Sequence, residues 1–304
     1  MDYYKKILIT GSNGMLGKDI ELSFLLDNKF DVFGINRKQD IDLDQARSII
    51  CNLTDFKELS RVLTCVRPDI IIHCAANVNV DKCEADKNYC YKLNSEAVRV
   101  LSSYNSPKTK FIYISTDSVF DGEKGNYVET DKTNPLNYYA FTKREGEKFA
   151  LQENKNSIVA RTNIYGFHTN RGNSLAEWAI NNLSKKNRIS GFDDVFFNPV
   201  YTKQFAEILV KLLDVDYKGL IHIGSNKYIS KYEFLKYLCR RFDFDDTLLK
   251  KGFVNDVDFN AERPKNTTLD VSKLEKITGY SVNIEDGLES FYHDYNNFRE
   301  AFYA

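Results

Sequence analysis

The sequence predicts an α/β protein built on a doubly wound parallel sheet, with a smaller, mostly helical C-terminal lobe. Short apolar runs alternate with helical patterns through the first half of the 304 residues, and this alternation is typical of a parallel sheet with helices on both faces. A glycine-rich turn follows the first apolar run directly. After residue 161 the alternation weakens, which indicates a second unit.

The first strand is predicted over residues 6–10, a short apolar run that ends at Gly11. Gly11 permits a tight turn, Gly14 lets the backbone approach a phosphate, and Gly17 lets the next helix pack against the strand. The N-terminus of that helix offers free N–H groups and a partial positive charge to an anion. The turn is therefore predicted to be Rossmann-like and to bind a dinucleotide through Gly11, Asn13, Gly14, Met15, Leu16 and Gly17.

The spacing of this turn, Gly-x-x-Gly-x-x-Gly, differs from the Gly-x-Gly-x-x-Gly of most dehydrogenases. A plain structural loop is the alternative interpretation. The position of the turn, directly after the first strand, favours the cofactor site.

The other elements follow in sequence order. Strands are expected at residues 31–35, 69–74, 110–115, 157–161 and 219–223. The first helix is expected to use Leu16, Ile20, Leu22, Phe24, Leu25 and Leu26 as its apolar positions. Further helices are expected at residues 55–66 (capped by Thr54 or Asp55), 84–104, 135–153, 178–183, 203–213, 232–242 and 284–302, with loop and short structure at 243–258.

These elements predict two domains. The dinucleotide-binding domain is expected to cover residues 1–165, with 195–225 and about 259–275 returning to it. A substrate-binding lobe is expected to consist of residues 166–194, 226–258 and 276–304. The lobe would close a cleft over the carboxyl ends of the strands, where ligands bind in open α/β sheets.

Composition argues against several classes of partner. A net charge of −1 gives no electrostatic footprint for nucleic acid or an anionic membrane, and no apolar run approaches the about 20 residues of a membrane span. Residues 1–6 run straight into the first strand, so we expect no signal peptide and a cytoplasmic protein. The six cysteines lack a Cys-x-x-Cys pair and the four histidines do not cluster, so we expect reduced, mostly buried thiols and no metal site.

The end of the second strand predicts the choice of nicotinamide cofactor. An Asp or Glu there would accept hydrogen bonds from the adenine ribose and favour NAD. Asn36 takes this position and is followed by Arg37 and Lys38, a neutral amide and two cations that suit a 2′-phosphate. We therefore expect NADPH rather than NADH, with a solvated turn as the alternative. Asn52 and Leu53 are expected to lie against the adenine.

Tyr139 and Lys143 are the most informative pair for chemistry. Four residues apart, they share one face of a helix, where the ammonium would stabilise the phenolate and lower the pKa of Tyr139. Thr116 ends strand 110–115, where its hydroxyl can hydrogen-bond a substrate carbonyl. Small residues after strand 69–74 would let the nicotinamide half of a cofactor lie close to backbone, namely Ala75, Ala76 and Asn77. A surface helix pair is the alternative for Tyr-x-x-x-Lys.

In their order along the chain, these motifs resemble those of the extended short-chain dehydrogenase/reductase family. The closer likeness is to its dTDP-4-dehydrorhamnose reductases, carried by residues 75–84, 115–122 and 263–270. The resemblance implies NAD(P)H-dependent reduction of the C4 ketone of a nucleotide-linked 6-deoxy-4-keto sugar, in deoxysugar or polysaccharide biosynthesis. It also implies a homodimer formed through helices on the sheet, with the helix at 84–104 as our candidate.

The resemblance assigns roles to individual residues. Tyr139 would donate a proton to the ketone as hydride arrives, Lys143 would tune Tyr139 and bind the nicotinamide ribose, and Thr116 would replace the usual serine. Asn94 matches a helix asparagine that orders a proton-relay water, with a satisfied helix amide as the alternative. The implied substrate contacts are Thr116, Asp117, Ser118, Asn163 and Arg263.

Two of these contacts bear on the nucleotide diphosphate. Arg263 would clamp it, with a salt bridge as the alternative role. The sugar-contacting tryptophan of the reductases is missing after strand 157–161. Asn163 there resembles the wider sugar-nucleotide family, in which the asparagine contacts the diphosphate. The particular sugar therefore stays open.

Two alternatives to a reductase remain. The first is a nucleotide-sugar epimerase or a 4,6-dehydratase on the same scaffold, but dehydratases of the family carry a glutamate where this chain has Ser118. The second is a non-catalytic, NADP-binding protein resembling the regulatory subunit of methionine adenosyltransferase. Intact Thr116, Tyr139 and Lys143 argue for catalysis.

Overall fold

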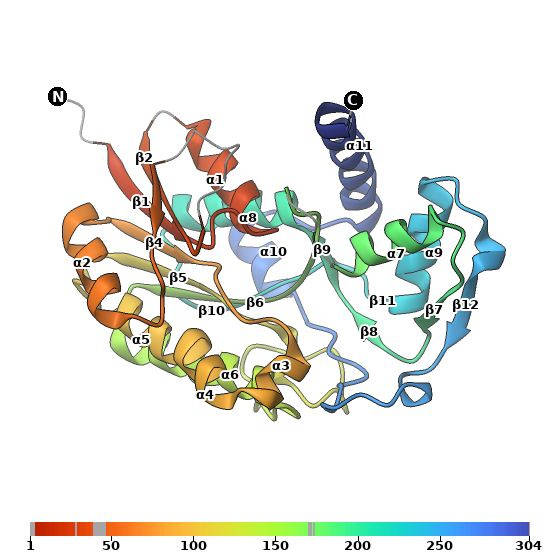
Figure 1. Ribbon diagram of the computed structural model, residues 1–304. Coiled ribbons are helices and arrows are strands. Elements are labelled where there is room, and N and C mark those ends of the chain that lie inside the picture. Colours follow the sequence, from red (N-terminus) through yellow and green to blue (C-terminus); the bar gives the residue numbers. More distant parts are fainter. Residues whose placement is uncertain (1–3, 28, 39–46, 170–171, 173, 304) are drawn as a thin grey trace.

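A parallel β-sheet forms the centre of the protein (Figure 1). The structure is a computed structural model that describes residues 4–27, 29–38, 47–169, 172 and 174–303. The strands lie in the order β10-β6-β5-β4-β1-β2-β3, with β9 paired to β6, and all these pairings are parallel. They are β1 (Lys5–Thr10), β2 (Phe30–Asn36), β3 (Arg47–Ile50), β4 (Ile70–His73), β5 (Lys110–Ile114), β6 (Ser157–Tyr165), β9 (Pro199–Tyr201) and β10 (Gly219–Ile223).

Helices cover both faces of this sheet. One face carries α1 (Gly17–Leu25), α8 (Thr202–Asp214) and α10 (Ser272–Thr278); the other carries α2 (Phe56–Val66), α5 (Ala97–Ser103) and α6 (Tyr138–Glu153). Three short segments lead into α5, namely α3 (Val80–Ala85), α4 (Lys87–Tyr91) and the π-helical turn η1 (Lys92–Glu96). The strand order reverses between β1 and β4, and such a switch point is where ligands bind.

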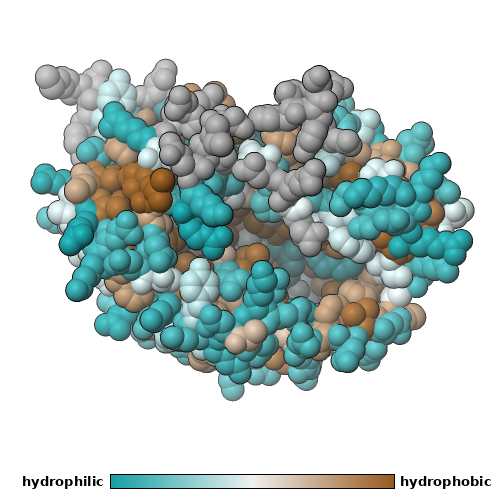
Figure 2. Space-filling model, in the orientation of Figure 1, coloured by the Kyte–Doolittle hydropathy of each residue, from teal (hydrophilic) through white to brown (hydrophobic). Residues whose placement is uncertain are grey.

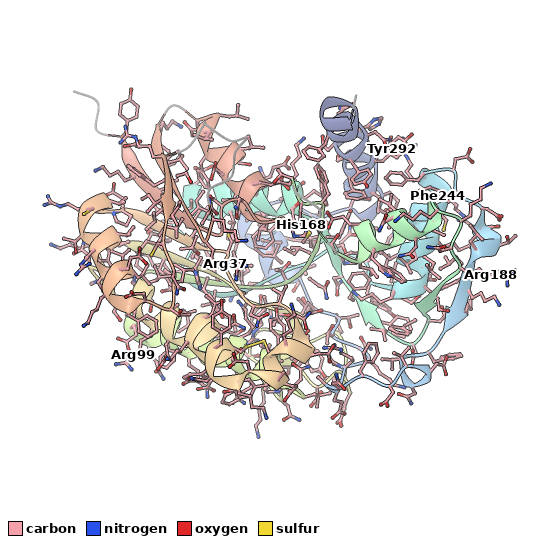
Figure 3. The ribbon with its side chains drawn as sticks, in the orientation of Figure 1. Arg37, Arg99, His168, Arg188, Phe244 and Tyr292 are labelled. Atoms are coloured by element: carbon pink, nitrogen blue, oxygen red, sulfur yellow. A yellow bond between two sulfur atoms is a disulfide. The ribbon has the colours of Figure 1, made fainter. Side chains whose placement is uncertain are left out.

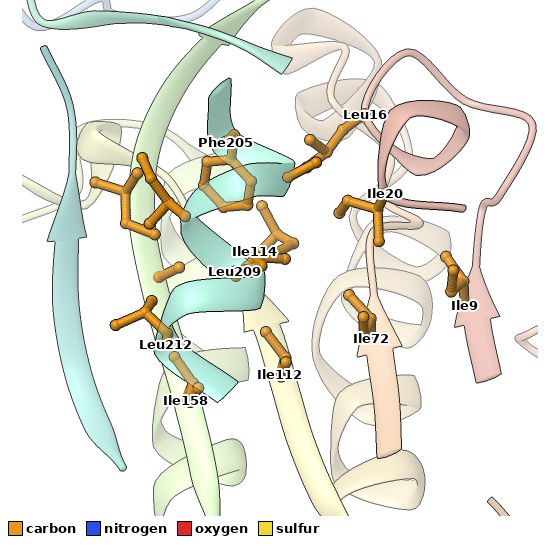
Figure 4. Close-up of a cluster of buried hydrophobic side chains, with 14 of the residues drawn as sticks. Ile9, Leu16, Ile20, Ile72, Ile112, Ile114, Ile158, Phe205, Leu209 and Leu212 are labelled. Atoms are coloured by element: carbon orange, nitrogen blue, oxygen red, sulfur yellow. The ribbon is translucent and has the colours of Figure 1, made fainter. Parts of the chain in front are cut away.

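The two cores follow from the pleat, which sends successive side chains of a strand to opposite faces. On β1, Ile7 and Ile9 belong to the cluster beneath α1 and α8, whereas Leu8 belongs to the cluster beneath α2 and α5. Figure 4 shows the first cluster, in which Ile20 of α1 and Phe205 of α8 lie over the isoleucines of the sheet. These packed layers hold the strand ends, and the residues that follow them, in fixed positions.

A smaller group of elements, here called the lobe, lies to the right of the sheet in Figure 1. It contains α7 (Leu175–Leu183), β7 (Ile189–Phe192), β8 (Phe196–Phe197), β11 (Ile229–Ser230), α9 (Lys231–Arg241), β12 (Leu249–Gly252) and α11 (Ile284–Tyr303). Phe234 of α9 and Phe291 of α11 pack edge-on against Tyr165, at the end of β6. The lobe is thereby anchored to a strand end, and Figure 2 shows the surface hollowed between lobe and sheet.

The predicted alternation is confirmed, since each expected strand is present. The single helix predicted over residues 84–104 is wrong. Helical structure starts at Val80 and breaks at Asp86, because the Asp86 carboxylate caps α4 by accepting from the N–H of Tyr89 (3.0 Å). Apolar spacing alone does not reveal a cap inside a helical pattern.

Smaller corrections concern other helices. Leu22 and Leu26 are exposed rather than buried. The helix expected from residue 135 begins at Tyr138, because the Asn137 side chain accepts from the N–H of Ala140 (2.9 Å). Residues 1–3, part of the stretch expected to leave no room for a signal peptide, lie outside the described residues. No helix in the described part of the chain combines the length and apolarity needed to cross a membrane.

Candidate active site

The turn between β1 and α1 has the geometry of a phosphate-binding loop. Gly11 is left-handed (φ +69°), and a Cβ there would lie 3.0 Å from the Ala75 Cα. A side chain at Gly17 would run into the Gly11 carbonyl group, so this close approach requires glycine. No side chain caps α1, and the N–H groups of Met15 and Leu16 have no backbone acceptor among the described residues. The helix N-terminus is therefore open to an anion such as a cofactor diphosphate.

Asn36, at the end of β2, holds this turn in place. Its amide nitrogen donates to Ser12 Oγ (2.9 Å), and its amide oxygen accepts from the Asn13 N–H (3.0 Å). Arg37, the next residue, is exposed (Figure 3), and Lys38 is exposed as well. Two cations thus lie beside the turn, and the preference for NADPH stays a prediction.

The other expected cofactor residues fall into two groups. Residues 75–77 follow β4 at the switch point and are partly exposed. Leu53 is buried in the cluster beneath α2, while the Asn52 side chain accepts from the hydroxyl and the N–H of Thr54 (2.9 and 3.2 Å). The first group lies where the nicotinamide half was expected. Contact of the second group with adenine stays a prediction.

Tyr139 and Lys143 lie one turn apart on α6 and meet the end of β5. The Lys143 ammonium donates to the Ile114 carbonyl oxygen (2.6 Å) and lies 4.2 Å from the ring centre of Tyr113. The Tyr139 phenol interacts with the Thr116 hydroxyl. The three side chains expected to be catalytic therefore gather at one strand end.

The expected lowering of the pKa of Tyr139 by Lys143 is wrong for this arrangement. Burial raises the pKa of Tyr139 to about 12, although hydrogen bonding with Thr116 opposes the rise. Burial also lowers the pKa of Lys143 to about 7, while the Glu147 carboxylate opposes that shift. The reason is that Lys143 is buried and Tyr139 partly buried, and that the ammonium donates to the Ile114 carbonyl oxygen. A phenol that stays protonated is the form that can donate a proton.

Glu147, one turn beyond Lys143, is a positioning residue that the sequence patterns missed. Its carboxylate forms a bidentate ion pair with Arg161 of β6 (2.7 and 2.9 Å) and accepts from Ser115 Oγ (2.6 Å). Both side chains of the ion pair are only 5% exposed. The Ser115 hydroxyl is thereby engaged by Glu147, whereas the hydroxyl of Thr116 interacts with Tyr139. The i, i+4 spacing from Lys143 is the signal that would have found Glu147.

Asp117 joins the end of β5 to two other parts of the chain. One carboxylate oxygen accepts from the hydroxyls of Thr116 and Ser118 (both 3.2 Å). The other accepts from the Asn163 amide (2.8 Å) and the Thr267 hydroxyl (2.6 Å). The substrate residues expected on β5 and β6 therefore surround one buried carboxylate. Thr267 is a further member of this group that was not singled out.

Asn94 is buried on η1 and its side chain is fully used. It accepts from the N–H of Asn77 (2.8 Å) and donates to the Asn77 carbonyl and the Thr142 hydroxyl (both 3.1 Å). Its backbone carbonyl accepts from Tyr113 (3.2 Å). This geometry fits the alternative role of Asn94, a helix amide whose hydrogen bonds are all made within the protein. Asn94 holds the turn after β4 against α6, next to Lys143.

Cys83 and Cys90 form a disulfide, so the expectation of reduced thiols is wrong for this pair. The helix break at Asp86 lets the two cysteines meet in the interior, where the Asn94 amide nitrogen is 3.3 Å from Cys90 Sγ. Spacing along a continuous helix would have kept them apart, which is why the sequence did not reveal the bond. The free cysteines are Cys51 and Cys239, which are buried, Cys74, which is partly buried, and Cys65, which is exposed.

Arg263 lines a cavity of about 490 Å³ beside the start of α6. It pairs with Asp81 (3.0 Å) and lies 5.1 Å from the ring centre of Phe259. Its Nη1 atom is buried without a hydrogen-bond partner among the described residues. Asn137, which caps α6, donates to the Glu262 carbonyl in the cavity wall (2.9 Å). The salt bridge is therefore present, and one guanidinium nitrogen is buried without a partner among the described residues.

The histidines are placed as core or paired groups. His73 Nδ1 lies 2.7 Å from the Thr10 hydroxyl, and burial lowers the pKa of His73 and His222 to about 3. His168 (Figure 3) pairs with Glu177 (2.8 Å). Within the described ranges, no group of three or more His, Cys, Asp or Glu side chains could hold a metal ion.

Nearly the whole chain matches one protein family, described as the RmlD substrate binding domain, over residues 5–297. The probable low-salt glycan biosynthesis reductase Agl14 of Haloferax volcanii is 28% identical over 298 residues, which are 95% of this chain and 99% of Agl14. The β subunit of methionine adenosyltransferase 2 from Xenopus tropicalis is 30% identical over 301 residues, 94% of this chain and 88% of that protein.

Solved structures share the fold. The hypothetical dTDP-4-dehydrorhamnose reductase from Sulfolobus tokodaii is 33% identical with a TM-score of 0.79, covering 93% of this chain and 98% of that one. The dTDP-4-dehydrorhamnose reductase from Bacillus anthracis, solved with NADP, is 26% identical with a TM-score of 0.83, covering 96% of this chain and all of that one. The predicted fold class and the predicted resemblance are confirmed.

Proposed function

The chain belongs to the RmlD substrate binding domain family, and from that premise we propose that it reduces the C4 ketone of a nucleotide-linked 6-deoxy-4-keto sugar with NADPH. The gathering of Tyr139, Lys143 and Thr116 at the end of β5 carries the proposal. The relatives support an oxidoreductase with a nicotinamide cofactor, since Agl14 is named a reductase and the Bacillus anthracis reductase was solved with NADP.

The glycine turn and the open N-terminus of α1 fit the cofactor diphosphate. The bound cofactor supplies the hydride. Tyr139 donates its phenolic proton to the ketone oxygen, which becomes a hydroxyl. The Thr116 hydroxyl, which donates to Asp117 in the structure (3.2 Å), rotates to donate a hydrogen bond to the same oxygen while negative charge develops on it. Lys143 contributes a positive charge near this oxygen and is available to the nicotinamide ribose.

The substrate is proposed to extend away from Tyr139 toward the lobe. The sugar lies against the Asp117 group, where Ser118 and Asn163 offer a hydroxyl and an amide. The nucleotide end enters the cavity beside Arg263, whose unpartnered nitrogen can bind phosphate or base oxygen. We place the reaction in deoxysugar or polysaccharide biosynthesis, and leave the sugar itself open.

A ketosugar panel tests the proposal. The purified chain is mixed with dTDP-4-keto-6-deoxymannose and related nucleotide ketosugars, and cofactor oxidation is followed with NADPH and with NADH. We expect turnover with at least one ketosugar, a lower Michaelis constant for NADPH than for NADH, and an alcohol at C4 by NMR. No oxidation with any nucleotide ketosugar would contradict the proposal.

The methionine adenosyltransferase relative favours one alternative, a regulatory subunit that binds NADP without turnover. A stoichiometric partner recovered by pulldown, together with absent turnover, would establish it. An epimerase is distinguished differently, because it would copurify with bound NAD and show no net oxidation. The intact Thr116, Tyr139 and Lys143 favour the reductase over the regulatory subunit.

Two further expectations about the working enzyme stay predictions. We expect a homodimer formed through helices on the sheet, in the region of α3 to α5, which size-exclusion chromatography with light scattering would test. We also expect a cytoplasmic location, which cell fractionation would test.

A further inference from the structure

Lys231, the first residue of α9, carries an ammonium group without a carboxylate in contact. Ser230 and Glu233 form a capping box at the start of this helix. The Ser230 N–H donates to the Glu233 carboxylate, and the Glu233 N–H donates to the Ser230 hydroxyl (both 3.0 Å). The Lys231 ammonium lies 3.2 Å from the ring centre of Phe197 and has no hydrogen-bond partner or ion pair among the described residues. Burial lowers the pKa of Lys231 to about 8, while the Asp117 carboxylate opposes the shift from a distance. A cation held this way gains from any anion that reaches it.

The position of Lys231 follows from the strands beside it. β8 pairs with β11, so that Phe196 is opposite Ser230. On its other side, Phe196 accepts from the N–H of Thr267 (3.3 Å) and donates to the carbonyl of Lys265 (2.7 Å). Lys265 lines the Arg263 cavity and Thr267 binds Asp117. Lys231 therefore lies beside the path that leads from the cavity to the end of β5.

Charge decides what Lys231 is suited to bind. A substrate with its ketone at Tyr139 and its nucleotide in the Arg263 cavity must place its diphosphate along the intervening path. Lys265, the other lysine on this path, is paired with Asp194 (3.0 Å). The ammonium of Lys231, held on an aromatic face, is the cation in this stretch without such a partner among the described residues.

We propose that Lys231 binds the diphosphate of the nucleotide-linked sugar and makes the site selective for diphosphate-linked substrates. This inference rests on the proposed function. It assigns a specificity role to a residue of the lobe that lies apart from the proton-transfer groups on α6 and β5.

Binding of a nucleotide without turnover tests the inference. The full chain, saturated with NADPH, is titrated calorimetrically with dTDP and with thymidine. The variants are Lys231→Met, which keeps the apolar stem, and Lys231→Arg, which keeps the charge. Lys227→Met removes an exposed charge in the segment that precedes β11 and serves as the matched control.

We expect Lys231→Met to weaken dTDP binding at least tenfold while thymidine binding changes less than twofold. Lys231→Arg should restore dTDP affinity to within about threefold of the wild type, and Lys227→Met should match the wild type. If Lys231 has a purely structural role, Lys231→Met should weaken the binding of dTDP and thymidine together, or should lower the unfolding temperature and the NADPH affinity. Either result would overturn the inference. Equal dTDP binding by Lys231→Met and the wild type would overturn it as well.

The same titration separates this inference from the proposed function. If the wild type binds neither dTDP nor, in a parallel titration, UDP, the proposed substrate class is wrong and Lys231 loses its assigned ligand. If the wild type binds dTDP and reduces a ketosugar but Lys231→Met does both equally well, the function stands and the inference fails.

Discussion

The Thr267 hydroxyl donates a 2.6 Å hydrogen bond to the buried carboxylate of Asp117, and this contact ties the C-terminal segment 263–270 to the end of β5. The segment also contains Arg263 in the cavity wall. A residue near the C-terminus therefore helps to set the geometry around Thr116 and Tyr139.

Replacing Thr267 with valine keeps the shape of the side chain and removes this donor. We expect a loss of about 1–3 kcal/mol of unfolding free energy and a raised KM for the ketosugar, with unchanged NADPH affinity. Urea unfolding and steady-state kinetics measure both, with the exposed Thr64→Val as control. If KM and stability both stay at wild-type values, the contact does not organise the site.

Glu147→Gln leaves the buried Arg161 without its counter-charge, and breaking such a pair costs about 3–5 kcal/mol. The carboxylate also raises the pKa of Lys143, so its loss shifts that pKa further down and the ammonium is lost at lower pH. We expect the alkaline limb of the pH–rate profile to move to lower pH. The exposed Glu207→Gln is the control; a Glu147→Gln profile that coincides with it would contradict the positioning role.

His73 makes stability depend on pH. Its pKa is about 3 in the folded protein against 6.5 for the free side chain, so between these values the unfolded chain binds a proton that the native state does not. The contribution of His73 to the free energy of unfolding is therefore complete above pH 6.5. It falls by about 1.4 kcal/mol per pH unit as the pH drops toward 3. His73→Asn keeps a polar partner for Thr10, and its unfolding free energy should fall less steeply between pH 6.5 and 5. Parallel slopes would show that His73 does not titrate there.

The disulfide predicts a thiol count. The chain has six cysteines and four of them are free. A thiol titration of the unreduced protein in denaturant should therefore find four thiols. The same titration after reduction should find six. Reduction removes a short loop constraint, and we expect it to cost about 2–3 kcal/mol of unfolding free energy. A count of six thiols before reduction would show that Cys83 and Cys90 are not bonded. Purification under argon guards against oxidation of the thiols during handling.

The sheet could be predicted because the strands β1, β2, β4, β5 and β6 are apolar runs separated by helical patterns. The edge strand β3 (Arg47–Ile50) escaped notice because three of its four residues are exposed and it lacks such a run. The interrupted helix at 80–103 was missed because Asp86 looks like an ordinary polar position in sequence. Its capping bond exists only once the chain has turned.

The grouping of Tyr139, Lys143 and Thr116 could be predicted because the first two follow a local helical spacing and the third follows a strand end. Their electrostatic state could not, because it depends on burial and on Glu147 and Ile114, which come from separate elements. Lys231 was invisible for a similar reason: nothing near it in sequence shows that the lobe brings it toward Asp117.

The central claim is that the Tyr139 phenol supplies the proton in ketone reduction, and the kcat of Tyr139→Phe with the best nucleotide ketosugar tests it most directly. General acid catalysis is worth about 10²–10⁴ in rate, so we predict that kcat falls at least a hundredfold while NADPH affinity is kept. Tyr138→Phe, one position earlier on the same helix, should stay close to the wild type. Ketone reduction by Tyr139→Phe at the wild-type rate would contradict the account.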